Sequence, residues 1–179
     1  MTQDSPAAAV RARPPWFGPG EDDPGTAVAG SYPIAKSKRL TMTIDDVRTH
    51  AQGLAFRLVL ERSNAWKPDS YDLKSWTHSF NRRLPRAGRL PALFAPEVLR
   101  VSVRFEDGSL ARSIDPGPWI LEPGEAPAGP VLVSLGGENL PHRFTQHYWV
   151  WPKPEGEVTI TCEWRSAGVS PTAVRIPLR

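Results

Sequence analysis

The stretch HYWVWPKPEGEVTITCEW, residues 147–164, holds three of the seven tryptophans and the only cysteine of this chain. Its second half alternates apolar and polar side chains from Val158 to Trp164. Successive side chains of a β-strand point to opposite faces, so this period of two predicts a strand with one buried face. The prolines and glycine of PKPEGE predict a loop that reverses the chain before it. Together the parts predict a β-hairpin.

The strand before that loop is apolar on both faces. In RFTQHYWVW one face carries Phe144, Gln146, Tyr148 and Val150, and the other carries Thr145, His147, Trp149 and Trp151. Apolar residues on both faces are typical of a strand inside a sheet that is covered on both sides. Either an N-terminal arm with Trp16 or the segment 63–96 would supply the outer cover. Cys162 then fills a core position as a small hydrophobe.

Alternation predicts further strands along the chain. Apolar positions with period two are Leu40, Met42 and Ile44, then Leu54, Phe56, Leu58 and Leu60, then Leu99, Val101, Val103 and Phe105. The first two runs predict a hairpin, and Asp107-Gly108 after the third predicts a type I′ turn, whose two central residues have positive φ. PWIL and PVLVSL are short strand candidates, and LGGENLP is interpreted as a turn. In TAVRIPLR, Pro177 marks an edge strand or a strand end.

About eight strands at these spacings predict an all-β fold, an antiparallel β-sandwich that is immunoglobulin-like or jelly-roll-like, with a closed barrel as the alternative. The 20 prolines in 179 residues favour many turns and irregular crossings. Residues 1–34 are rich in proline, glycine and acid and predict an arm that is partly disordered or packed on the domain. Residues 35–179 form the domain, with an irregular insertion at 63–96.

Composition and net charge argue against several classes of protein. The net charge of +3 is mild, which argues against a nucleic-acid binder. A single cysteine excludes an internal disulfide and fits a reducing compartment. We find no signal peptide and no apolar run near the ~18 residues that span a bilayer. The expected location is the cytoplasm, without membrane contact.

No catalytic or metal-binding pattern stands out. Only His142 and His147 are close among the histidines, and odd spacing on one strand sends them to opposite faces, so we predict no metal site and no cofactor. Cys162 lies in a stretch that predicts burial, which makes a thiol inert, and His147 could face it only if the register placed both on one face. Neither a Walker lysine nor a Gly-x-Ser-x-Gly sequence occurs.

Seven residues are candidates for binding: Trp16, Trp76, Arg82, Arg83, His147, Trp149 and Trp151. Trp16 belongs either to a docking peptide or to an arm laid on its own domain. The arginines of NRRLPRAGR lie in a solvated loop or contact an acidic or phosphate group of a partner. Trp149 and Trp151 share a face, so they either pack against the chain itself or present rings to a protein or a sugar.

The order of several motifs resembles a family of uncharacterised actinobacterial proteins. The matching pieces are PPWFGPGEDDPG (14–25), the alternating runs at about 39–62, RVSVRFEDG, and YWVWPKPEGEVTITCEWRSAGV (148–169). Lys153 and Glu155 depart from the more apolar loop that is usual in that family. The resemblance implies a shared fold and an actinobacterial origin, and it implies no activity.

We therefore expect a non-enzymatic intracellular protein-binding module that uses its arm, its insertion or an edge strand. A ligand-binding or carbohydrate-binding domain on the Trp149 and Trp151 face is the alternative. A third hypothesis is an enzyme whose site is assembled from distant loops, with His147 or His78 beside a carboxylate.

Overall fold

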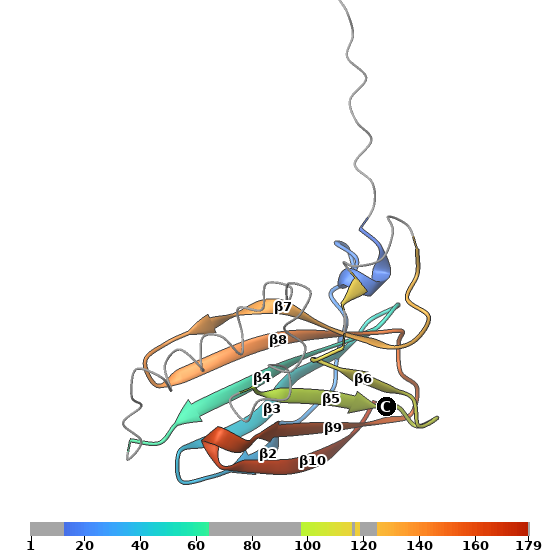
Figure 1. Ribbon diagram of the computed structural model, residues 1–179. Helices are drawn as coiled ribbons and strands as arrows, with labels where there is room; N and C mark the ends of the chain where they lie inside the picture. The colour runs from blue at the N-terminus through green and yellow to red at the C-terminus, as the bar shows by residue number, and fades with distance from the viewer. Residues whose placement is uncertain (1–12, 65–97, 116, 119–124, 179) are drawn as a thin grey trace, which may run out of the picture.

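The computed structural model describes residues 13–64, 98–115, 117–118 and 125–178, which form two facing antiparallel sheets (Figure 1). The larger sheet has the order β1-β3-β4-β8-β7, with β2 also paired to β3, and the smaller has the order β10-β9-β5-β6. The predicted all-β sandwich is thereby confirmed. The described part of the chain contains strands and short 3-10 helices and no α-helix.

The larger sheet comprises β1 (Thr26–Ala27), β2 (Tyr32–Lys36), β3 (Leu40–Thr49), β4 (Leu54–Arg62), β7 (Val131–Asn139) and β8 (Arg143–Trp151). The smaller comprises β5 (Arg100–Arg104), β6 (Leu110–Arg112), β9 (Glu157–Trp164) and β10 (Val169–Pro177). Two 3-10 helices accompany them, η1 (Pro15–Phe17) and η4 (Arg165–Ala167).

The core lies between the sheets and follows the predicted alternation. In β9 every second residue is buried, and the apolar positions predicted for β3, β4 and the run from Leu99 to Phe105 are buried as well. Cys162 and Trp164 belong to this core, as predicted. β8 lies between β4 and β7 and is buried on both faces. The predicted interior position of this strand is therefore confirmed.

The predicted hairpin between the two strands of residues 144–164 is wrong. β8 pairs with β4 and β7 in the larger sheet, whereas β9 pairs with β5 and β10 in the smaller. Residues 152–156 therefore cross from one sheet to the other. Alternation shows which face of a strand is buried, but it carries no information about which strand lies beside it. β8 instead forms a hairpin with β7, so Gly136–Asn139 of the predicted turn LGGENLP belong to a strand.

The predicted type I′ turn after β5 is also wrong. Asp46 is the one non-glycine residue with positive φ in the described part of the chain, so Asp107 has negative φ. Gly108 has φ +86°, and its amide donates to Phe105 O at 3.1 Å. This is a three-residue loop closed by a left-handed glycine, the next most common hairpin connection. Asp107 Oδ1 accepts from the Ser109 amide at 2.8 Å, which stabilises the loop without positive φ at the aspartate.

Two strands of the larger sheet were not predicted. β1 and β2 lie within or across the end of the range 1–34, where alanine, glycine and proline weaken any strand pattern. Residues 119–121 of the strand predicted for PWIL and nearly all of the segment 63–96 lie outside the described residues. β10 is an edge strand whose last residue is Pro177, as predicted.

Candidate functional site

The first described residues, from Arg13 onward, lie at one end of the larger sheet, where β8 ends and η1 sits above it (Figure 1). The indole of Trp149 is fully buried, and its Nε1 donates a hydrogen bond of 2.9 Å to the carbonyl oxygen of Pro15. The edge of the Trp16 ring meets Trp151, with ring centroids 5.8 Å apart at 69°. The structure thus brings together three of the predicted site residues: Trp16, Trp149 and Trp151.

The bound arm has an extended start. Pro14 has φ −57° and ψ 143°, which is the polyproline II conformation. The chain then turns through η1, where the Phe17 amide donates to Pro14 O at 3.1 Å. Arg13 donates from its guanidinium to Phe17 O. A short Arg-Pro-Pro-Trp segment therefore lies on a tryptophan that offers its N–H to a proline carbonyl.

Asp23 makes a second set of contacts between the arm and the domain. Asp23 accepts hydrogen bonds from the amides of Gly25 at 3.0 Å and Ala51 at 2.8 Å. These bonds, the one from Ala51 first, lower the pKa of the Asp23 carboxyl below its ordinary value. His50 Nδ1 lies 3.3 Å from Asp23 Oδ1, and its buried ring meets Trp149 edge to face at 5.3 Å.

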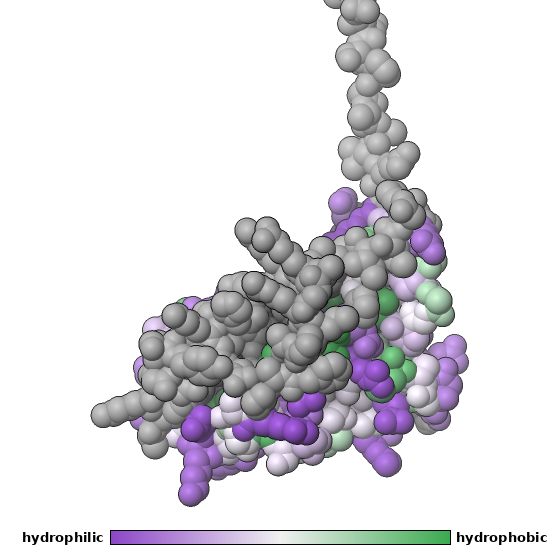
Figure 2. Space-filling view, in the orientation of Figure 1, coloured by the Kyte–Doolittle hydropathy of each residue, from purple (hydrophilic) through white to green (hydrophobic). Residues whose placement is uncertain are grey.

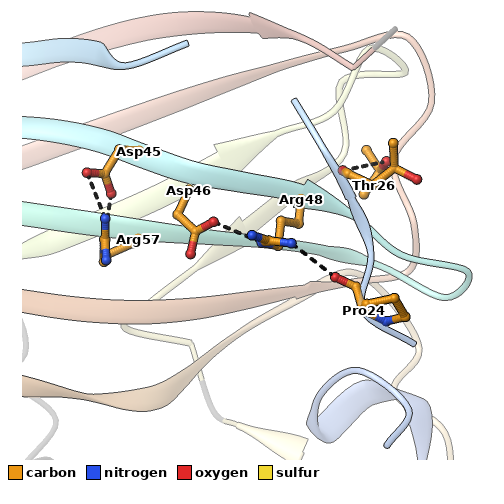
Figure 3. A network of polar contacts seen from close by, with 7 residues as sticks. Pro24, Thr26, Asp45, Asp46, Arg48 and Arg57 are labelled. Carbon is orange, nitrogen blue, oxygen red and sulfur yellow. Dashed lines mark hydrogen bonds and ion pairs between the residues drawn. The ribbon is translucent and has the colours of Figure 1, made fainter. Parts of the chain in front are cut away.

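Further polar contacts are made by side chains of β3, beside the arm. Arg48 donates to Asp46 at 2.8 Å and to the carbonyl of Pro24 at 3.3 Å, and Thr49 donates to Thr26 O at 3.4 Å (Figure 3). Each of these exposed contacts contributes little by itself. The bonds to the carbonyls of Pro24 and Thr26 hold residues 24–26 against β3, and the contact with Asp46 orients the Arg48 guanidinium within β3.

An open groove lies at the same end of the sandwich and begins at Trp151. Its volume is about 710 Å³. Three loops form its walls: the β5–β6 loop, the segment before β7, and the crossover after β8. The lining residues are Phe105, Glu106, Asp107, Ser109, Pro127, Ala128, Gly129, Pro130, Trp151, Pro152, Lys153, Pro154 and Glu155. Figure 2 shows apolar surface gathered at this end of the molecule, below η1 and beside hydrophilic residues.

The rim of the groove is acidic although the whole chain is basic. Glu106, Asp107 and Glu155 face a single cation, Lys153, among the lining residues. Hydrogen bonds from the hydroxyl and amide of Ser109 lower the pKa of Asp107, so this carboxyl stays ionised well below neutral pH. Glu106 lies against Gly156, where an added Cβ would fall 1.8 Å from Glu106 Oε2.

His147 lies apart from the groove, in a polar row on the outer face of the larger sheet. The strand register places Asp45, Arg57 and His147 side by side on β3, β4 and β8. Arg57 binds Asp45 through two bonds of 2.7 and 3.1 Å (Figure 3), and this carboxylate raises the pKa of the guanidinium. Arg57 thus stands between the imidazole and the carboxylate, so this row does not form the histidine–carboxylate pair expected of a hydrolase.

The remaining candidates form no site within the described residues. Trp76, Arg82 and Arg83 lie outside the described residues. Cys162 is buried among apolar side chains, and burial raises the pKa of its thiol to about 12. His147 and Cys162 belong to different sheets. Within residues 13–64, 98–115, 117–118 and 125–178, no cluster of three histidine, cysteine or acidic residues could hold a metal ion. The described residues also include no helix that is long and apolar enough to span a bilayer.

Sequence reasoning missed most of the groove. Phe105 is predicted in the core, where it lies, Pro127 in a turn and Pro130 at the start of a short strand, and nothing in their spacing places them beside Trp151. One signal was present: prolines cluster in the segments before PVLVSL and after YWVW. Aromatic-lined grooves bind extended proline-rich segments, so the aromatic run, rather than the prolines beside it, is the feature that points to peptide binding.

Comparisons with protein-family models, with curated proteins and with solved structures gave no match for this chain. The resemblance to an actinobacterial family accordingly stays a prediction.

Proposed function

We propose that this protein is a non-enzymatic protein-binding module that holds an extended segment of a partner in the groove beside Trp151. The observation that carries the proposal is the double role of this tryptophan. Trp151 supports the arm through Trp16, and it also forms a wall of the groove. The surface that binds the N-terminal residues Pro15 and Trp16 of the chain itself therefore continues into an open groove.

The shape and composition of the groove support this use. Its volume falls within the ~300–1,000 Å³ of typical ligand pockets, and it is open rather than enclosed, as suits a chain that enters and leaves. Aromatic and proline side chains lose little conformational entropy on binding, because they have few rotamers to restrict.

The carbohydrate alternative has less support. A two-ring platform needs both Trp149 and Trp151 to present their faces, but Trp149 is 0% exposed. Its N–H is already used by Pro15. We therefore do not carry the sugar-binding hypothesis forward.

The proposal predicts that filling the groove abolishes binding. Peptide ligands would first be selected from a random display library on the wild-type protein. Ala128 is exposed on the groove wall, so Ala128→Trp adds bulk inside the groove without disturbing the core. We expect selected ligands to bind this variant at least about tenfold more weakly, a change of about 1.4 kcal/mol.

Ala173→Trp is the matched control, since Ala173 is an exposed alanine on β10 and lines no part of the groove. It should bind the selected peptides as the wild type does. Thermal unfolding would show that both variants fold. Recovery of no ligand, or equal affinity for the Ala128→Trp variant, would contradict the proposed function.

A further inference from the structure

We infer that the segment held in the groove is a basic, proline-rich peptide in the polyproline II conformation. This inference rests on the proposed function and adds the chemical class of the partner. Three observations carry it: the conformation of the arm, the rigid walls of the groove, and the charge of its rim.

The arm shows what the neighbouring aromatic surface accepts. Pro14 alone has polyproline II dihedral angles, and the carbonyl that accepts the indole N–H of Trp149 is that of Pro15, the first residue of the 3-10 helix η1. A polyproline II helix has no internal hydrogen bonds, so its carbonyls are available to donors on a binding surface. Recognition of such helices in aromatic-lined grooves is a recurrent mode, because the ligand is already extended and little entropy is lost.

The groove continues this surface with similar chemistry. Trp151 supplies a partly exposed aromatic ring, whereas Phe105 is only 9% exposed, and the accessible prolines Pro127, Pro130 and Pro152 supply rigid apolar walls. Prolines have no backbone N–H, so such walls offer few donors for β-strand pairing with a ligand. A ligand that needs no strand pairing and presents apolar rings fits these walls better than a β-strand does.

The rim selects the charge of the ligand. Three carboxylates against one lysine give the lining a net charge of −2, whereas the whole chain is +3. Glu155 is exposed beside Pro154, and Asp107 is exposed on the β5–β6 loop, where hydrogen bonds from Ser109 lower its pKa. Arginine binds carboxylates through two parallel hydrogen bonds, so arginines between prolines would meet the rim while the prolines meet the rings.

The test uses fluorescence anisotropy with the full chain and a labelled probe peptide, Ala-Pro-Pro-Arg-Pro-Pro-Arg-Pro-Ala. One comparison peptide has glutamate in place of arginine, and a second has glycine in place of proline. We expect the probe to bind with a Kd below about 1 mM, and both comparison peptides to bind at least about tenfold more weakly. Added salt should weaken probe binding, since rim charges are exposed.

Variants locate the probe on the groove. The double variant Glu106→Gln/Glu155→Lys changes the net charge of the lining from −2 to +1 and should weaken probe binding at least about tenfold. Glu61→Lys is the control, because Glu61 is exposed at the opposite end of β4 and should leave the affinity within about twofold. Ala128→Trp should abolish binding.

The possible outcomes distinguish an error in the class of peptide from an error in the proposed function. If the probe fails to bind, binds no better than the comparison peptides, or binds the double variant equally well, the basic polyproline class is wrong. In that case groove-dependent library ligands that are acidic or free of proline would still support the binding module. If the probe binds the Ala128→Trp variant unchanged, it competes with the arm or with a second copy's arm for Trp151, and the assignment to the groove is wrong.

Discussion

The indole of Trp149 is a buried apolar ring that also carries a hydrogen-bond donor. It fills a fully buried position on β8, and it also carries a polar N–H into that position. A buried donor without a partner costs about 1–3 kcal/mol, so the carbonyl of Pro15 removes a penalty as well as forming a bond. A glycine accommodates the ring: a Cβ on Gly53 would lie 2.4 Å from Trp149 Cζ2.

This pairing predicts slow exchange of one indole proton. In protein labelled with ¹⁵N-tryptophan, the Trp149 N–H should exchange with deuterium at least about tenfold more slowly than the Trp151 N–H. The physical reason is that Trp149 is buried and bonded to Pro15, whereas Trp151 is partly exposed. Trp151 serves as the internal reference in the same sample. Equal exchange rates would mean that the arm does not stay on Trp149.

Residues also explain where the sequence misleads. The alternation in β3 stops at Ile44, but the buried face continues at Val47 because a bulge inserts an extra residue at Asp46, with φ +45°. In β7, a Cβ on Gly137 would lie 1.9 Å from Thr145 O, so the glycine is needed for close strand approach. A glycine pair predicts a turn from composition, yet here it permits a strand.

At the scale of elements, the arm is held by contacts with the domain rather than by a core of its own, and one carboxylate, Asp23, joins two segments. The amides that bind Asp23 come from two segments, Gly25 in the arm and Ala51 in the β3–β4 loop. A lowered pKa in the folded state means that folding favours the ionised carboxyl. This stabilisation is present above the ordinary value of 3.8 and is lost as the pH falls through the lower folded pKa.

Replacement of Asp23 by asparagine should therefore lower stability in a pH-dependent way. Urea unfolding should show a deficit for Asp23→Asn at pH 7 that shrinks as the pH falls below about 3.8. His50 faces Asp23 and is unchanged in both proteins. Asp22→Asn is the matched control, because Asp22 is an exposed neighbour for which no side-chain contact is found within the described residues. A constant deficit across this range would show that Asp23 does not act through its charge.

The pairing of the strands limits how much of the candidate site could be predicted from the sequence. Residues with period two were placed on the correct faces of β3, β4, β5, β8 and β9, because one buried face is enough to impose that pattern. The proximity of Trp16, Trp149 and Trp151 follows from an arm that the composition suggested. The groove could not be predicted, because its three walls come from loops whose distance in space depends on which strands pair.

At the scale of the molecule, two sheets share one core, and local links hold them together. Ser37 and Arg39, in the turn between β2 and β3, donate to the carbonyls of Ala167 and Ser166 at 2.9 and 2.5 Å. The crossover after β8 joins the sheets at the other end. Because β9 is flanked by β10 and β5, its inward side chains become accessible only when the core itself opens.

The rate at which the Cys162 thiol is alkylated measures that opening. Its thiol is 0% exposed with a pKa of about 12, and thiolates are the reactive form, so iodoacetamide should label it only through large-scale unfolding. A domain with a stability of about 5 kcal/mol or more would be labelled at least about 1,000-fold more slowly when native than in denaturant. An exposed thiol, made by Ser170→Cys in a Cys162→Ala background, should differ little between the two conditions. Native labelling of Cys162 within about tenfold of the denatured rate would mean that the smaller sheet opens locally, and that the core does not fold as one unit.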